Sequence, residues 1–525
     1  MYRRTLLFLC PLALLASCRE GATPHTNGVD GSLAAVDLVP TPMVPEVSAA
    51  LEAAGDNRAE LERAITESQG DERKAAAWLV ARTPYRGTVG EVEAVLTKQP
   101  DAETVSAALL RSHISKAFEA WKRWPWAREV DSDTFLRFVL PYRMTTEALE
   151  DWRSYFLSQA DLVAAVERFS EEYAAAQDKP AVFRRLVHFL NTEWLASRMK
   201  YAPRGMPDLP PSKAIEAKTG RCTDLTNALI ALCRTFGIAA TGVRTIWWPR
   251  GDSNHYWATM YDPAAKTWYD VDGGAGGPCE DAYFHIQHGG LHAKVYKVVP
   301  GEERGAVARS VEPGDGESIP PLLDWYLRCL PMVDVTSDYA HVTDVTLGGL
   351  DPGRLYGLAV FNNAGLQEVS ASRADPTGTV NFPAVGCDDV LYFVTWFEWR
   401  EGSLKQHLAR APFVARPSGR IEQMASPQAP FLGGVEVVLG PFPRNEELVV
   451  RAIIPSINSD GWQELGVKMT DESGALTLPR ALLNTVFVVF HKDGRPAGRP
   501  YVAIPGPPDD WGVPSISATV VAERF

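Results

Sequence analysis

One cysteine stands where a chemically active thiol would be expected. In the run TGRCTDLTNALIALCRTFGI, which spans residues 219–238, Cys222 follows Gly220 by two residues and opens a helix-periodic segment. The apolar stripe of that segment is formed by Leu225, Leu229, Leu232 and Phe236. Unpaired N–H groups and the dipole at a helix N-terminus favour a thiolate, so Cys222 is a candidate nucleophile. The alternative is a small buried residue, which we expect of Cys233, deeper in the same helix.

A nucleophilic thiol needs a base, and the base needs an orienting group. Alternation in SNHYWATMYDPAAKTWYDVD places His255 on one face of a strand, and Asp270 and Asp272 on one face of the next strand. The letters DPAA between them are a turn signal. If the proline and first alanine of DPAA are the two turn residues, His255 falls opposite Asp272 and Trp257 opposite Asp270. This register selects Asp272 as the partner of the imidazole.

The same residues resemble the transglutaminase-like superfamily. In that family a G-x-C motif opens a helix, and segments of the types R-x-x-G-I-P-A-R, H-x-W and W-x-x-x-D follow. Here GRC, RTFGIAATGV, NHYWATMY and WYDVD stand in that order, with two alanines where the family often has Pro-Ala. The resemblance covers residues 183–277 and implies a papain-like core. It implies that Cys222 is the nucleophile, His255 the base and Asp272 the orienting acid.

The resemblance also implies an oxyanion hole. The family usually builds it from the N–H of the cysteine itself and one upstream side chain. Trp194, Asn191 and Tyr201 are the candidates in this sequence, and spacing does not choose among them.

The elements that must position these residues indicate an α+β protein. Helical periodicity dominates residues 45–180, as in the runs 48–67, 71–83, 102–124 and 159–176. Residues 181–300 are predicted to form the transglutaminase-like core, with strands within 238–248, 253–262 and 266–272. Short strands and Gly/Pro turns then predict two all-β, sandwich-like modules at residues 330–425 and 427–525.

The N-terminus is typical of an export signal. The run MYRRTLLFLCPLALLASC has two arginines and then an apolar stretch that is too short to span a bilayer. Its ending, Leu-Ala-Ser-Cys, resembles a bacterial lipobox in which Cys18 becomes the lipidated first residue. We therefore expect a lipoprotein signal peptide at residues 1–17, a flexible tether at 18–44 and a membrane-anchored lipoprotein of the bacterial cell envelope. An ordinary signal peptide that is cut nearby is the alternative.

The other cysteines and histidines suggest no metal centre. Five widely spaced cysteines remain after Cys18, which is not a disulfide framework. The run CEDAYFHIQHGGLH contains Cys279, His285, His288 and His292 and has a composition that can bind zinc. Its spacing matches no metal motif, so we expect a solvated loop. The aromatic run WKRWPW at residues 121–126 is expected to be a helix end packed by tryptophans rather than a carbohydrate or peptide groove.

Composition bounds the function. The chain has 525 residues, of which 46% are hydrophobic and 22% charged, so it is globular and long enough for about three domains. A net charge of −13 without a basic cluster argues against nucleic acid. We expect a cysteine enzyme without a cofactor that acts on amide bonds of a protein, peptide or glycopeptide, either by hydrolysis or by acyl transfer to an amine. The alternative is a non-catalytic peptide- or glycan-binding lipoprotein that keeps the same fold.

Overall fold

The structure is a computed structural model. It describes residues 35–92, 95–249, 254–274, 291–302, 330–362, 365–387, 390–400, 403–423, 435–453, 462–481, 485–498, 500–502, 520–521 and 523–524. The predicted signal peptide, Cys18 and most of the predicted tether lie outside the described residues. So do Cys279, Cys329, His285 and His288.

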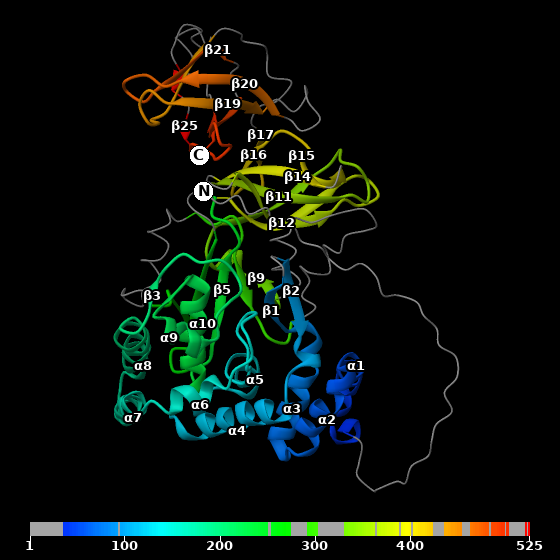
Figure 1. Cartoon of the computed structure of the whole chain (residues 1–525), viewed down its shortest axis with the longest axis vertical. Helices are drawn as coiled ribbons and strands as arrows, with labels where there is room; N and C mark the ends of the chain where they lie inside the picture. The colour runs from blue at the N-terminus through cyan, green and yellow to red at the C-terminus, as the bar shows by residue number, and fades with distance from the viewer. Residues whose placement is uncertain are drawn as a thin grey trace, which may run out of the picture. The chain divides into compact units, whose positions relative to one another are not determined.

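The chain is divided into two compact units. The first comprises Met1–Gly242, Trp257–Cys279 and Val299–Glu303, and the second comprises Val243–Tyr256, Glu280–Val298 and Arg304–Phe525. In Figure 1 the helices α1 to α10, coloured blue through green, belong to the first unit, and the yellow to red strands belong to the second. The order of elements confirms the predicted α+β class: helices come first, then a helix and sheet core, then antiparallel sheets.

The N-terminal part is mainly helical, as predicted. Its helices begin where side chains cap the unpaired N–H groups of the first turn: Ser106 accepts from Leu109 N at 3.2 Å before α4, and Asp178 caps α8. The helices are α1 (Val44–Ala53), α2 (Arg58–Thr66), α3 (Gly70–Val80), α4 (Ala107–Arg123), α5 (Ser132–Phe138), α6 (Trp152–Leu157), α7 (Ala160–Ala175) and α8 (Lys179–His188).

Two features of this part differ from the periodic pattern. The run 48–67 is divided into α1 and α2, because Gly55 adopts a left-handed φ of 52° that a helix cannot continue through. A hairpin of β1 (Gly87–Val92) and β2 (Val95–Pro100) lies inside the region predicted as helical. Its first strand contains two glycines, which weaken any strand pattern.

The central part contains the helix that Cys222 opens. It consists of a π-helix, η7 (Phe189–Leu195), the short strands β3 (Lys200–Tyr201) and β4 (Thr219–Gly220), and the helices α9 (Pro211–Ala217) and α10 (Cys222–Thr235). Every residue of α10 from the second onward is buried, which is typical of a helix enclosed on all sides. Its sheet has the order β7-β6-β5-β8-β9, with β5 (Ala240–Thr245), β6 (His255–Asp262), β7 (Thr267–Val271), β8 (Tyr296–Val298) and β9 (Met332–Asp334).

The remaining strands of the second unit form antiparallel sheets with one added parallel pair. One group contains a two-stranded sheet, β10-β13, and a sheet of order β12-β11-β14-β16-β17 in which β15 also pairs with β14. The next contains the sheets β21-β18-β24 and β20-β19-β22-β23-β25. The strands are β10 (Val342–Leu347), β11 (Leu355–Asn362), β12 (Gly365–Arg373), β13 (Val380–Gly386), β14 (Leu391–Arg400), β15 (Ser403–Leu408), β16 (Phe413–Ala415), β17 (Ile421–Gln423), β18 (Val435–Leu439), β19 (Glu447–Ile453), β20 (Trp462–Met469), β21 (Leu476–Ala481), β22 (Val486–His491), β23 (Tyr501–Val502), β24 (Val520–Val521) and β25 (Glu523–Arg524).

The aromatic run at residues 121–126 packs in the core of the first unit. Helix α4 ends before Trp124, which stacks on Trp126 with ring centroids 5.7 Å apart. Both rings are buried, and the Trp126 indole donates to the carbonyl of Phe236 at 2.8 Å. The predicted packing role of these tryptophans is therefore confirmed. Cys233 is fully buried on α10, as predicted.

None of the helices within the described residues combines the length and the apolar composition that a bilayer-spanning helix requires.

A buried carboxyl group in the second unit links stability to pH. Glu368 on β12 is 3% exposed and accepts hydrogen bonds from Thr395 at 2.8 Å and Gln406 at 2.6 Å. Burial raises the pKa of Glu368 to about 7, although the two hydrogen bonds favour the charged form. The folded protein therefore keeps a proton on Glu368 at pH values where the unfolded chain has released it.

We expect the second unit to lose stability as the pH rises from about 4.5 to about 7. Because the folded state binds the extra proton, the free energy of unfolding falls across this window by about 3 kcal/mol. Glu368→Gln removes that loss, since a neutral amide keeps the hydrogen bonds without a titrating charge. Urea unfolding at several pH values measures the slope. The matched control is Glu472→Gln at an exposed position, which should leave the slope unchanged; an unchanged slope in Glu368→Gln would contradict the assignment.

Candidate active site

The start of helix α10 is held by a buried carboxylate. Asp224 is fully buried, and its oxygens accept from Arg221 N at 3.0 Å and Leu209 N at 2.8 Å. Arg204 donates to the same carboxylate at 3.0 Å. The bond to Arg221 N is the carboxylate half of a capping box at the first turn, and Cys222 opens that turn as a half-buried residue. Asp224 therefore ties the backbone next to Cys222 to the segment that contains Arg204 and Leu209.

This clamp explains the glycine two residues before the cysteine. A Cβ atom at Gly220 would lie 2.7 Å from the Cβ of Asp224, a distance that side chains do not tolerate. Gly220 also pairs with Tyr201 of β3 in a short parallel bridge. Only a residue without a side chain allows Asp224 to reach back and cap the helix.

A second buried carboxylate holds the N-cap residue. Asp208 accepts from the guanidinium of Arg221 and from the hydroxyls of Thr145 at 2.8 Å and Thr146 at 2.9 Å. Burial opposes ionisation, but the Arg221 charge and these hydrogen bonds lower the pKa of Asp208 overall. Each carboxylate near the start of α10 thus has its own arginine, so neither adds an uncompensated negative charge beside the thiol of Cys222.

The far end of α10 is anchored by a buried arginine. Arg234 donates to the main-chain carbonyls of Phe138 and Ala240, both at 3.0 Å, and to those of Pro141 and Arg143, both at 3.2 Å. Three residues later Gly237 has a φ of 71°, and a Cβ there would lie 2.6 Å from the Cβ of Ala127. In the R-x-x-G segment, the arginine therefore anchors the last turn of the helix and the glycine allows the chain to turn away from it.

The turn that carries Asp272 packs against the first turns of α10. A Cβ at Gly273 would lie 2.8 Å from the backbone N and Cα atoms of Thr226, so the turn touches the helix backbone one turn after Cys222. Asn191 of η7 locks this turn by donating to the carbonyl of Asp272 at 3.0 Å and accepting from Gly274 N at 2.8 Å. The structure therefore brings the backbone of Asp272 next to the helix of Cys222.

The hairpin between β6 and β7 has a different register from the predicted one. Asp262 pairs with Thr267, and Thr259 with Asp270, so four residues rather than two form the loop. The reason is local: Asp262 accepts from the backbone N–H groups of both Ala264 and Ala265, and Lys266 adopts a left-handed φ of 56°. The side chain of Asp262 thus extends the turn by two residues.

The shift moves the expected partner of Asp272 by two residues along β6 but keeps Asp272 on the same face. Continued past the paired residues, the observed register puts Asp272 opposite Trp257 instead of opposite His255. Because side chains alternate with a period of two, a shift of two residues leaves Asp272 on the face shared by His255 and Trp257. Diagonal neighbours of this kind stay within reach of long side chains. The pairing of His255 with Asp272 stays a prediction.

His255 is the first residue of β6 and is half-buried. Its ring lies 6.5 Å from that of Trp248, measured between centroids, at an interplanar angle of 27°. Trp248 is 1% exposed. The base candidate therefore has an apolar aromatic neighbour.

The candidates for the oxyanion hole differ in their surroundings. Both amide atoms of Asn191 hold the Asp272 turn, which assigns it a positioning role. Tyr201 is 63% exposed, whereas a donor to an oxyanion acts best where water is excluded. Trp194 is 3% exposed, and its indole N–H has no hydrogen-bond partner within the described residues. Of the three candidates, Trp194 is therefore the one with a buried donor that no described residue uses.

Some positioning residues were not singled out from the sequence. Asp224 stands three residues after the N-cap, where the acidic residue of a capping box stands, although the N-cap is Arg221 rather than a serine or threonine. Asp208 and Arg204 gave no local signal because their partners depend on the fold. Within the described residues, no group of three or more His, Cys, Asp or Glu side chains is arranged to hold a metal ion.

A comparison with protein families points to the same segment. A model of the Transglutaminase-like superfamily matches residues 169–273, which include Cys222, His255 and Asp272. Over 62 residues the chain is 39% identical to the peptide-N(4)-(N-acetyl-beta-glucosaminyl)asparagine amidase of Eremothecium gossypii. That stretch is 12% of this chain and 16% of the amidase, so the chain spans only a small part of this relative.

A solved structure of a tetra-tandem repeat in the extending region of a large adhesion protein overlaps 55% of this chain and 66% of its own. The TM-score is 0.11 and the identity 7%, a likeness that carries no argument about the fold. The match to the superfamily model, by contrast, coincides with the motifs around α10, β6 and β7. Residues 169–273 are therefore a domain of the transglutaminase-like superfamily.

Proposed function

We propose that the protein is a cysteine amidase that cleaves a carboxamide through a thioester at Cys222. The observation that carries the proposal is the packing of the Asp272 turn on the first turns of α10, locked by Asn191. A nucleophile and its orienting acid must be held by rigid elements, and this arrangement holds both backbones together.

In the proposed reaction the Cys222 thiolate attacks the carbonyl carbon. The C–N bond breaks, the thioester forms, and His255 gives its proton to the leaving nitrogen. Water, deprotonated by His255, then attacks the thioester and releases a carboxylic acid and the thiolate. An amine that replaces this water would give a new amide instead. Asp272 orients the imidazole and stabilises its charged form.

The substrate that we propose is a peptide or glycopeptide amide. The amidase relative is named for a peptide asparagine whose amide nitrogen carries N-acetylglucosamine, which makes a substituted side-chain amide a reasonable substrate class here. Tyr256 and Trp257, next to the base candidate, are buried, and an apolar site that excludes water would favour transfer to an amine over hydrolysis. We nevertheless favour hydrolysis because the two buried carboxylates at the start of α10, Asp208 and Asp224, are each paired with an arginine and are not available to recruit a cationic amine.

The test supplies three peptides to the full chain: one with glutamine, one with glycosylated asparagine, and one with an isopeptide bond. Each is incubated with and without an excess of primary amine, and mass spectrometry follows acid, adduct and released amine. Dominance of the free acid supports the hydrolytic proposal. Dominance of the amine adduct would replace hydrolysis by transfer. No product from any peptide, together with a thiol at Cys222 that alkylates slowly, would favour a binding module.

We also propose that Cys18 anchors the protein to a membrane as a lipidated N-terminus, on the basis of the Leu-Ala-Ser-Cys ending. We expect Cys18→Ser to abolish membrane partitioning or processing, because a thiol is needed for lipid attachment. Fractionation and mass spectrometry of the mature N-terminus measure this. Unchanged partitioning with no lipid on the wild-type protein would contradict the anchor, without bearing on the chemistry of Cys222.

A further inference from the structure

The short strand β3 pairs on one side with β4, the strand that leads into α10, and its other edge carries unpaired backbone groups. Lys200 N donates to the carbonyl of Lys218 at 2.9 Å. Ala202 N donates to the carbonyl of Gly220, also at 2.9 Å. Backbone groups of successive residues in a strand point to opposite edges, so the N–H and C=O of Tyr201 face away from β4. Neither group makes a hydrogen bond to a described residue, so an extended peptide can pair with this edge.

The side chain at this edge is an exposed aromatic ring. Tyr201 is 63% exposed, and the other large hydrophobic side chains with comparable exposure among the described residues, Val467 and Met469, belong to the second unit. Gly220, the residue that pairs with Tyr201, has no side chain to cover the ring. Exposed aromatic rings are typical of binding surfaces. Gly220 is two residues before Cys222, at most about 7 Å along the chain, so Tyr201 can contact a substrate that is bound at the thiol.

Two lysines beside β3 carry charges without an acidic partner. Lys200 and Lys218 are exposed, and neither forms an ion pair with a described residue. The two arginines near the start of α10 differ, because each is paired with a buried carboxylate. The backbone hydrogen bond keeps the two lysines next to each other, and adjacent like charges favour a bound anion. Lys218 is four residues before Cys222, at most about 14 Å along the chain.

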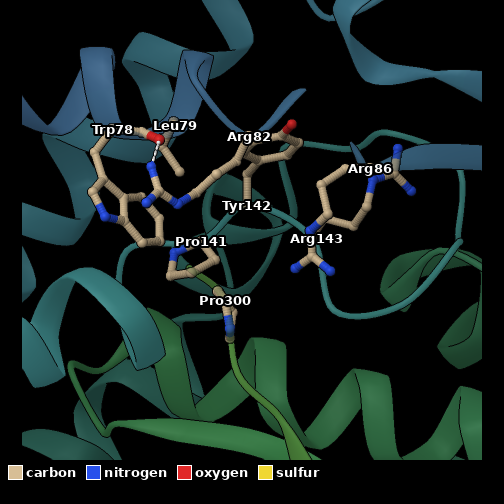
Figure 2. A pocket seen from close by; sticks show the side chains of 8 residues that line it. All are labelled: Trp78, Leu79, Arg82, Arg86, Pro141, Tyr142, Arg143 and Pro300. Atoms are coloured by element: carbon tan, nitrogen blue, oxygen red, sulfur yellow. Dashed lines mark hydrogen bonds between the residues drawn. The ribbon is translucent and has the colours of Figure 1, made fainter. Parts of the chain in front are cut away.

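A hollow inside the first unit offers no alternative place for a substrate. It lies between α3, the segment after α5 and Pro300 (Figure 2), and it has room for about one water molecule. Arg143 in its wall is bound to Asp101 at 2.6 Å, so the charge of this arginine is already matched. The exposed edge of β3 is therefore the better place for a substrate to be recognised.

We propose that Tyr201, Lys200 and Lys218 form a recognition edge that selects an acidic, extended peptide for cleavage at Cys222. The inference rests on the proposed amide cleavage and names its substrate class. The peptide pairs with the outer edge of β3, and the ring of Tyr201 packs on the substrate.

The spacing and the charge of this edge define the peptide further. Carboxylates three or four residues from the scissile amide would pair with the two lysines, because an extended chain of that length covers the distance from Cys222 to Lys218. The same two charges repel a cationic amine. The recognition edge would therefore favour water over a lysine side chain as the acyl acceptor.

The test measures binding apart from turnover. The full-length Cys222→Ala variant binds peptide without cleaving it, and fluorescence anisotropy gives its affinity for three labelled peptides. The peptides share a central glutamine and differ at the third and fourth residues on both sides, which are Glu, Gln or Lys. We expect the Glu peptide to bind roughly 3- to 10-fold more tightly than the Gln peptide, and the Lys peptide to bind most weakly. This preference should shrink as salt is added.

Substitutions in the same background separate the lysines from the ring. Lys200→Gln combined with Lys218→Gln should bring the affinities for the Glu and Gln peptides to within about twofold of each other. The matched control, Lys74→Gln combined with Lys122→Gln, removes the same charge from exposed positions on α3 and α4 and should keep the preference. Tyr201→Ala should weaken the binding of all three peptides about 10-fold, whereas Tyr201→Phe, which keeps the ring, should not.

Thermal unfolding checks that the variants fold, which we expect because the substituted side chains are exposed. If Tyr201→Ala does not fold, N-methylation of the Glu peptide replaces it as a test. Edge pairing needs the N–H groups of the peptide, so N-methylation should weaken binding roughly 10-fold. Three results would overturn the recognition edge: no preference for Glu over Lys peptides, an unchanged preference in the double lysine variant, or unchanged affinity in both Tyr201→Ala and the N-methylated peptide.

Hydrolysis of the same peptides by the wild-type chain tests the proposed function separately. Tight binding of the Glu peptide without cleavage would contradict amide cleavage and leave the recognition edge standing. Cleavage of all three peptides at equal rates, with equal affinities, would overturn the recognition edge and leave amide cleavage standing.

Discussion

Cys222→Ala should lower the rate of amide cleavage by roughly a thousandfold or more and leave the protein folded. The thiol is the only group in the proposed reaction that can form the thioester, so its loss removes the covalent route altogether. Cys222 is half-buried at the first position of α10, and the clamp of Asp224 on Arg221 N does not involve its side chain. The helix should therefore form as before.

The same helix supplies the control. Cys233→Ala removes a thiol that is fully buried in the core, so it should cost some stability through the cavity that it leaves and little activity. Alkylation with iodoacetamide near neutral pH, mapped by mass spectrometry, should modify Cys222 quickly and Cys233 slowly. Full activity of Cys222→Ala, or faster alkylation of Cys233, would refute the assignment of the nucleophile.

The local features of the site could be predicted because each depends on a short stretch of consecutive residues. The apolar stripe of α10, the alternation in β6 and β7, and each single motif occupy fewer than twenty consecutive residues. Such periodicities directly reflect helix and strand geometry. The class of the fold followed for the same reason, since helical and strand patterns occupy separate parts of the chain.

The features that could not be predicted depend on contacts between distant residues. Asn191 is 81 residues from the carbonyl that it holds, at Asp272. Asp208 is 63 residues from the Thr145 hydroxyl that it accepts from. The predicted register of the hairpin was wrong for a local reason. The side chain of Asp262 accepts from two backbone amides of the turn, and the loop is longer than predicted. Alternation fixes the face of a residue, but only the turn fixes its partner.

The observed register makes the prediction for the orienting acid more specific. Asp272→Asn should reduce turnover far more than Asp270→Asn, by roughly 100-fold or more, because an amide cannot hold the imidazole in the required tautomer. Under the observed register Asp270 pairs with Thr259, which lies four residues along β6 from His255. Asp272 lies at the end of β7 nearer to His255, on the turn that packs against α10.

The two substitutions make the same chemical change at positions two residues apart, so a difference between them separates a loss of catalysis from a loss of stability. Each removes one charge, and Asn191 contacts the main chain of Asp272 rather than its side chain, so Asp272→Asn should leave the turn in place. The loss should appear in kcat with little change in KM, since an imidazole in the wrong tautomer still permits substrate to bind. Thermal unfolding of both variants, measured alongside the kinetics, checks that the fold is intact. Equal losses of kcat in the two variants would mean that neither carboxylate orients His255, and the search for the orienting group would then move to another element.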